Sequence, residues 1–189
     1  MLEALLQWDE NAFLFLNGLG TTWLDQPMRL ISGVWIWIPL YAAVAWLFFK
    51  SLPTPKALIV VALCVVGVII TDQGTFWLFK ETFKRLRPCQ VDELRAQMRF
   101  VADYCGMYGF VSSHAANTVG FAVLAGGVLK THIKWLSPTL MLWALLVSFS
   151  RVYLGVHYPL DIIGGAFFGM LVGRLLLRYA EKRVLLKTT

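Results

Sequence analysis

The stretch that decides the fold is "ALIVVALCVVGVIITDQGTFWLF", residues 57–79, which carries a single charged side chain, Asp72. A helix of this length can cross the hydrocarbon core of a bilayer, which is about 30 Å thick. The rest of the chain has the same character, because 58% of its 189 residues are hydrophobic, 15% are charged, and the mean hydropathy is +0.66. We therefore predict an all-α integral membrane protein, a class in which so few charges are normal.

Apolar runs on both sides of this stretch predict four further spans. They cover about 28–49, 113–129, 135–150 and 160–178. Pro39 is expected to kink the first of them, because an interior proline removes a helix hydrogen bond. The predicted fold is thus a bundle of five to six transmembrane helices in a single membrane-embedded domain, residues 1–189.

The N-terminal segment, residues 1–27, is predicted to contain an interfacial helix. Its first 20 residues mix apolar side chains with Glu3, Asp9 and Glu10, which favours an amphipathic helix at the membrane surface. A re-entrant or spanning segment is the alternative. The same residues contain no basic side chain, so a cleavable signal peptide is not expected.

The distribution of charge predicts the orientation. Five spans place the turns 50–56 and 130–134 on the same side as the C-terminus, and this side is rich in Lys and Arg. Basic loops stay cytoplasmic, so this side should be cytoplasmic and the loop segment 80–112 should face outward. Cys89 and Cys105 lie in that segment and could pair there, or could remain free thiols.

Three polar clusters fall at the outward ends of the spans. They are "KETFKRLRP" (80–88), "GFVSSHAAN" (109–117) and "SRVYLGVHYPLD" (150–161). Lys80 and Arg87 are seven residues apart, which predicts that they share one helix face and can grip an anion. Ser112 or Ser113 is expected to cap the third span beside His114, which makes that helix start an anion site.

The third cluster contains a candidate nucleophile. Pro159 is tolerated in a first helical turn, so the fifth span should begin at Tyr158 or Pro159, with His157 at its mouth. Asp161 in the first turn can then reach back and fix the tautomer of the His157 ring. Together with Arg151, the clusters supply an anion clamp, an oriented imidazole and a second histidine. This inventory suits a metal-free phosphoryl transfer through a phosphohistidine, and it contains no obvious metal-ligand set.

These motifs resemble those of the type 2 phosphatidic acid phosphatases, also called lipid phosphate phosphatases. The first and third clusters match at every defining position, whereas "VSSH" has Val111 and Ser113 where the family usually has proline and glycine. The resemblance covers residues 80–161. It implies a bacterial inner-membrane enzyme whose active site faces the periplasm or outside, with no cofactor, a lipid substrate and no nucleic-acid partner.

The resemblance also implies a role for each matched residue. His157 is the expected nucleophile, Asp161 its orienting partner, and His114 the acid that protonates the leaving group. The expected phosphate-binding residues are Lys80, Arg87, Ser112, Ser113 and Arg151.

Several alternatives stay open. The substrate could be undecaprenyl diphosphate, phosphatidylglycerol phosphate, phosphatidic acid or the 1-phosphate of lipid A, and the compact 89–110 loop slightly favours an isoprenyl diphosphate. The same site could instead transfer its phosphoryl group to another lipid. A transporter or binder of anionic lipids would explain the cations, but it would leave the two histidines and Asp161 without a role.

Overall fold

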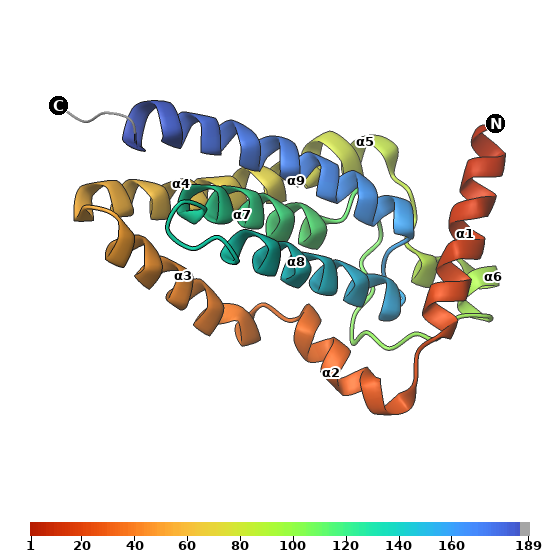
Figure 1. Ribbon diagram of the computed structural model, residues 1–189. Coiled ribbons are helices and arrows are strands. Elements are labelled where there is room, and N and C mark those ends of the chain that lie inside the picture. Colours follow the sequence, from red (N-terminus) through yellow and green to blue (C-terminus); the bar gives the residue numbers. More distant parts are fainter. Residues whose placement is uncertain (186–189) are drawn as a thin grey trace.

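The computed structural model describes residues 1–185 and contains helices but no strand within them. The main helices are α1 (Leu2–Gly18), α2 (Thr22–Ser32), α3 (Ile38–Ser51), α4 (Thr54–Gly74), α5 (Glu81–Phe83), α6 (Asp92–Arg95), α7 (Ser113–Leu129), α8 (Leu136–Tyr153) and α9 (Pro159–Ala180). In Figure 1, α3, α4, α7, α8 and α9 form a bundle, and α1 lies across one end of it. The prediction of an all-α fold is confirmed.

Several of these helices qualify as membrane spans. Three helical stretches are long and apolar enough, namely Thr54–Phe83, Leu136–Tyr153 and Pro159–Leu185. The first joins α4 to α5 through a π-helical segment, Thr75–Lys80. α2 and α3 qualify together as a fourth span bent by 68°. The described chain therefore has three to four candidate spans and is an integral membrane protein.

The bend between α2 and α3 is not where the sequence predicted it. The helix ends at Gly33, whose backbone is extended, and a 3-10 turn, Trp35–Trp37, leads into α3. Pro39 lies in the first turn of α3, where its missing N–H costs no helix hydrogen bond. The expectation that Pro39 kinks a continuous helix over 28–49 is therefore wrong.

α7 lies between α4, α8 and α9, and its contact with α9 is very close. A Cβ atom on Gly169 would lie 2.1 Å from the carbonyl oxygen of Ala116, and one on Gly165 would lie 2.3 Å from that of Ser112. Small residues allow two helix backbones to approach in this way. The close approach fixes the start of α7, which carries His114, against the first turns of α9.

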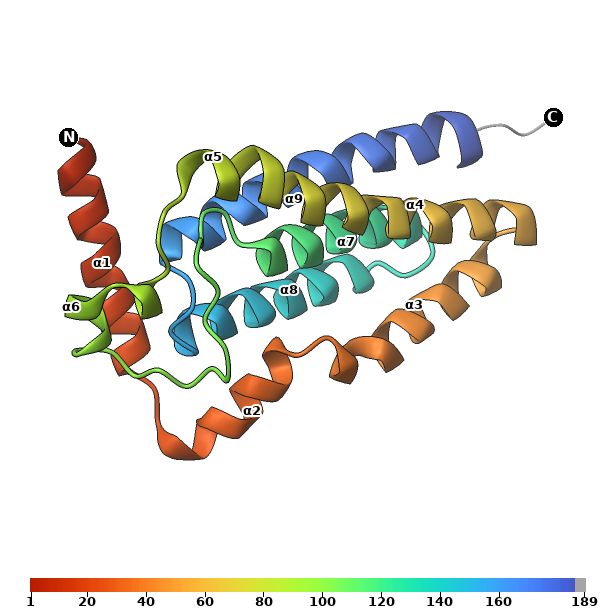
Figure 2. The same ribbon diagram turned by 180° about the vertical axis from the view of Figure 1, so that it is seen from behind.

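The three polar clusters meet at the end of the bundle that α1 crosses. The backbone N–H of Ser112 donates to the carbonyl of Asp161 at 2.9 Å, and Lys80 Nζ donates to Ser113 Oγ at 2.7 Å. The α3–α4 and α7–α8 turns lie at the opposite end, as Figure 2 shows. The predicted convergence of the clusters is thus found in the structure.

α1 is helical, as expected, but one of its faces is buried. Asp9, Phe13 and Asn17 follow one another at four-residue spacing, and each is 0% exposed. Asn17 Nδ2 donates to the carbonyls of Val152 and Tyr153, the last two residues of α8. The N-terminal helix is therefore anchored to the end of the bundle by specific polar contacts as well as by its apolar side chains.

Candidate active site

His157 and Asp161 lie at the junction of α8 and α9. Tyr158 is the N-cap of α9 and Pro159 its first residue, so His157 stands just outside the helix, as predicted. Asp161 Oδ2 accepts a hydrogen bond from the Tyr158 backbone N–H at 3.1 Å and lies 3.2 Å from His157 Nδ1. Because the carboxylate is an acceptor, Nδ1 carries the proton and Nε2 keeps its lone pair.

The environment of His157 favours the neutral imidazole. The side chain is only 1% exposed. Burial, followed by the nearby guanidinium of Arg87, holds the pKa of His157 well below its usual range, because both disfavour a second positive charge. A neutral, oriented imidazole can attack an electrophile.

Arg85 binds the second carboxylate oxygen of Asp161, a contact between residues far apart in the sequence. Its Nη1 lies 3.1 Å from Asp161 Oδ1, and its Nη2 lies 2.7 Å from Asp9 Oδ2 on α1. The guanidinium also stacks 3.9 Å from the ring centroid of Tyr158. Asp9 in turn accepts the backbone N–H of Leu160 at 2.9 Å. The orienting carboxylate is thus connected to the N-terminal helix.

Three cations face the same space without a carboxylate partner. Among residues 1–185, none of Lys80, Arg87 and Arg151 has an Asp or Glu oxygen within 4 Å. Arg151 donates from Nη1 to Ser32 Oγ, while its buried Nε has no hydrogen-bond partner. Arg87 donates from Nε to the Tyr108 carbonyl at 3.0 Å. An unpaired buried donor and three cations without a carboxylate partner are what an anion site requires.

The structure corrects the predicted geometry of the first cluster. Lys80 and Arg87 were expected on one helix face, but the helix ends at Phe83 and Lys84 adopts a left-handed conformation with φ of 46°. Arg87 is therefore in an extended segment. The two side chains still converge, because both line the cavity described below.

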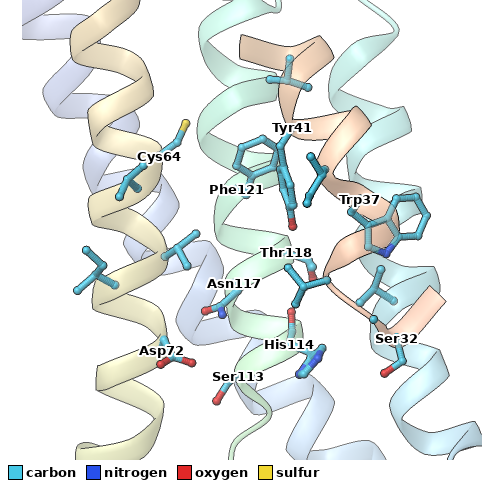
Figure 3. A pocket seen from close by; sticks show the side chains of 18 of the residues that line it. Ser32, Trp37, Tyr41, Cys64, Asp72, Ser113, His114, Asn117, Thr118 and Phe121 are labelled. Carbon is cyan, nitrogen blue, oxygen red and sulfur yellow. The ribbon is translucent and has the colours of Figure 1, made fainter. Parts of the chain in front are cut away.

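The start of α7 contributes the second cluster. Ser112 is its N-cap, with a side chain that accepts the Ala115 N–H at 3.5 Å, and it is fully buried. Ser113 Oγ contacts both Lys80 Nζ and Thr75 Oγ1 at 2.7 Å. Figure 3 shows Ser113 and His114 at one end of a cavity. Ser113 and His114 line this cavity, whereas Ser112 and Asp161 lie behind it.

The cavity has a volume of about 840 Å³ and runs from the polar cluster into the bundle. Its polar end is formed by Lys80, Arg87, Ser113, His114, Arg151 and His157. Its other end is lined by apolar and aromatic side chains of α3, α4 and α7, among them Tyr41, Phe48 and Phe121. Such a cavity can take a molecule with an anionic head and an apolar tail. Within residues 1–185, no group of three or more His, Cys, Asp or Glu side chains is arranged to hold a metal ion.

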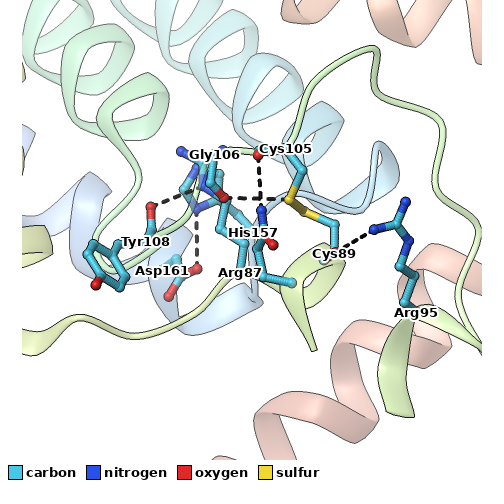
Figure 4. Close-up of a disulfide and its surroundings, with 9 residues drawn as sticks. Arg87, Cys89, Arg95, Cys105, Gly106, Tyr108, His157 and Asp161 are labelled. Carbon is cyan, nitrogen blue, oxygen red and sulfur yellow. Dashed lines mark hydrogen bonds and ion pairs between the residues drawn. A yellow bond between two sulfur atoms is a disulfide. The ribbon is translucent and has the colours of Figure 1, made fainter. Parts of the chain in front are cut away.

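A disulfide holds the loop beside this site. Cys89 and Cys105 are joined, one of the two alternatives left open by the sequence, and Figure 4 shows the bond next to Arg87. The backbone of Arg87 pairs with that of Met107 at 3.1 Å. At Gly109 the chain passes so close that a Cβ atom would lie 2.8 Å from Asp161 Oδ2. The loop therefore packs directly against the His157–Asp161 pair.

Two residues of this network, Asp9 and Arg85, were missed as parts of the site. The sequence places Arg85 in the basic "KETFKRLRP" cluster and Asp9 among the carboxylates of the N-terminal helix, and neither pattern points to the site. The four-residue spacing of Asp9, Phe13 and Asn17 was a usable signal, because it places a carboxylate and an amide on the same helix face as an aromatic residue.

Comparisons with known proteins give a consistent result. Residues 55–185 match the family described as the PAP2 superfamily. The lipid A 4'-phosphatase of Porphyromonas gingivalis is 34% identical over 186 residues, which cover 96% of this chain and 78% of the relative. The lipid A 4'-phosphatase of Bacteroides thetaiotaomicron is 32% identical over 184 residues, which cover 96% of this chain and 81% of that relative. The crystal structure of a transmembrane PAP2-type phosphatidylglycerolphosphate phosphatase from Bacillus subtilis superposes with a TM-score of 0.73 at 22% identity, covering 95% of this chain and 88% of that one.

Proposed function

Because this chain belongs to the PAP2 superfamily and is a phosphatase of membrane lipids, we propose that its substrate is lipid A and that it removes the 4'-phosphate through a phosphohistidine. The single observation that carries the chemistry is the His157–Asp161 pair facing three cations that have no carboxylate partner. The choice of lipid is supported by two lipid A 4'-phosphatases that match 96% of the chain.

In the proposed first step, His157 Nε2 attacks phosphorus while Asp161 holds the proton on Nδ1. An N–P bond forms, the bond to the sugar oxygen breaks, and its electron pair leaves with that oxygen. His114 donates the proton that makes the leaving group a neutral alcohol. Lys80, Arg87 and Arg151 compensate the charge on the phosphoryl oxygens, and Ser113 contributes its backbone N–H at the start of α7.

In the second step, water attacks the phosphohistidine. His114, now without its proton, accepts one from the water, the N–P bond breaks, and inorganic phosphate leaves. Ser112 acts in this scheme as the N-cap that fixes the start of α7, because its backbone N–H is bound to the Asp161 carbonyl and its side chain does not line the cavity. A lipid hydroxyl in place of water would make the enzyme a phosphoryl transferase, so products as well as phosphate release must be measured.

We further propose that the whole chain is one membrane domain with five spans: α2 with α3, α4 with α5, α7, α8 and α9. α7 has 17 residues and would be about 25 Å long, slightly short of the hydrocarbon core. α1 would then lie at the outer face of the cytoplasmic membrane, and the basic turns and C-terminus would be cytoplasmic. The positive-inside pattern and the Cys89–Cys105 disulfide support this orientation.

The orientation predicts the redox state of the cysteines. If membranes are lysed in an alkylating reagent and the denatured protein is analysed by mass spectrometry without reductant, Cys89 and Cys105 should be found joined. Cys64 is an internal control, because it is free in the structure and should carry the alkyl group. Alkylated Cys89 and Cys105 in most molecules would contradict an outward-facing loop.

The function is tested by turnover on a panel of lipids in the presence of a chelator. The purified protein should release phosphate from lipid A without added metal, with a kcat/KM at least about tenfold above those for undecaprenyl diphosphate, phosphatidylglycerol phosphate and phosphatidic acid. Activity that depends on a divalent ion would contradict the metal-independent mechanism. A preference for another lipid on the panel would contradict lipid A as the substrate.

A further inference from the structure

Asp72 is a carboxylate within a membrane span that the mechanism above does not use. It lies in Thr54–Phe83 and lines the cavity. Within residues 1–185, its carboxylate accepts a hydrogen bond only from the side chain of the next residue, Gln73 Nε2, at 3.3 Å. No Lys, Arg or His nitrogen of residues 1–185 lies within 4 Å of it. An ionisable side chain inside a membrane is costly and commonly has a function.

Asp72 also disfavours substrate binding, because it shares the cavity with a phosphate site. A carboxylate repels an anionic substrate, so its presence weakens the field of Lys80, Arg87 and Arg151. A carboxylate at this position could instead stabilise a polar contact within the bundle. The structure shows no such contact between helices among the described residues. The acceptor oxygens of Asp72 are instead turned toward the cavity, as Figure 3 shows.

Asn117 lies near Asp72 on the neighbouring helix, because Thr71, the residue before Asp72, is bonded to it. It lies on α7, close to one turn beyond His114, and it lines the cavity. Its Oδ1 accepts a hydrogen bond from Thr71 Oγ1 at 2.6 Å, which fixes the amide plane. The Nδ2 group has no partner among residues 1–185. The pair thus offers one anionic acceptor from α4 and one amide donor from α7.

The depth of this pair matches a defined part of a lipid substrate. Asp72 lies beside Ser113 and His114 at the polar end, and Asn117 lies farther along the cavity toward Phe121. A substrate whose phosphate is held by the clamp would therefore place the atoms next to its ester oxygen beside Asp72 and Asn117. A hydroxyl group both donates and accepts, so it can satisfy both side chains.

We propose that Asp72 and Asn117 form a subsite that recognises a hydroxyl or amide group of the substrate's headgroup, between the phosphate and the acyl chains. This inference rests on the proposed function and adds the determinant of its specificity. A phosphorylated sugar such as the headgroup of lipid A carries such groups. An isoprenyl diphosphate has no such group beyond the diphosphate, so it would leave the acceptor and the donor in the cavity unpaired, which disfavours its binding relative to a hydroxylated headgroup.

The test compares two substrates in the same variants. In Asp72→Ala, kcat/KM for lipid A should fall by about 10- to 100-fold, mainly through KM. For undecaprenyl diphosphate it should stay within about threefold or rise, because a negative charge beside the anion has been removed. Asn117→Leu should shift the ratio of the two kcat/KM values in the same direction. Asp72→Asn, which keeps the shape of the side chain, covers the case in which the alanine variant fails to fold.

Glu81→Gln is the matched control, since it removes a carboxylate from the same continuous helical stretch but outside the cavity. The ratio of its kcat/KM values for lipid A and undecaprenyl diphosphate should equal that of the unmodified protein. Equal losses on both substrates in the Asp72 variants, or no loss on either, would overturn the subsite while leaving the proposed function intact.

Failure of the unmodified protein to hydrolyse lipid A is a separate outcome. It would contradict the proposed substrate, and the subsite would then be tested with phosphatidylglycerol phosphate, which has a glycerol hydroxyl next to its phosphate ester. In Asp72→Ala, a fall in kcat/KM for phosphatidylglycerol phosphate without a fall for undecaprenyl diphosphate would support the subsite. An equal fall for both lipids would overturn it.

Discussion

His157→Ala is expected to lower kcat on lipid A by about three or more orders of magnitude. The variant removes the only imidazole within residues 1–185 that is oriented by a carboxylate, and with it the nucleophile of the proposed phosphoenzyme. The fold should survive, because Asp161 keeps its contacts with Arg85 and the Tyr158 backbone N–H. Phosphate release from purified protein, with thermal unfolding as a check on folding, measures the effect.

His132→Ala is the matched control for this experiment. His132 is exposed in the turn between α7 and α8, at the end of the bundle opposite the site, and it should be replaceable without loss of activity. Activity in His157→Ala within about tenfold of the unmodified protein would contradict a nucleophilic role, because residual catalysis by the clamp alone is far weaker.

His114→Ala is expected to show the second-largest loss, and its size should depend on the leaving group. On lipid A the loss should be about 10²- to 10⁴-fold, because the sugar oxygen needs a proton as it departs. An aryl phosphate analogue releases a stable anion that needs no such proton. With the aryl phosphate, the burst of phenolate release reports the first step only. The rate of this burst should therefore fall by about tenfold or less in His114→Ala. Rapid-mixing measurements with both substrates separate the two cases.

His157→Ala is the comparison for this leaving-group effect, since loss of the nucleophile should abolish the burst with both substrates. An equal loss of the first step on lipid A and on the aryl phosphate in His114→Ala would contradict the role of general acid. It would instead indicate that His114 serves the phosphate clamp or the packing of α7.

The sequence predicted those parts of the site in which the chemistry is local. The His157–Asp161 contact spans four residues and follows from the position of Pro159, and the N-cap at Ser112 follows from local capping rules. Apolar length was enough to predict α4, α8 and α9. These features depend on neighbours in the chain, so their spacing can be interpreted directly.

The features that were missed depend on distant contacts. Arg85 is placed by Asp9 and Asp161, which are each 76 residues away, so neither contact leaves a local pattern. The left-handed turn at Lys84 breaks the expected helical register of Arg87, although no glycine or proline signals it. Gly33, in contrast, is a local signal for the bend, which Pro39 does not cause.

The central claim, a covalent intermediate on His157, is tested most directly by trapping it. The protein is mixed with radiolabelled lipid A, quenched in alkali within one turnover, and digested for mass spectrometry. The phosphate should be found on His157 in a bond that is stable to alkali and labile to acid, and it should be absent from His157→Ala. Label on another residue, or label that persists in His157→Ala, would contradict the mechanism.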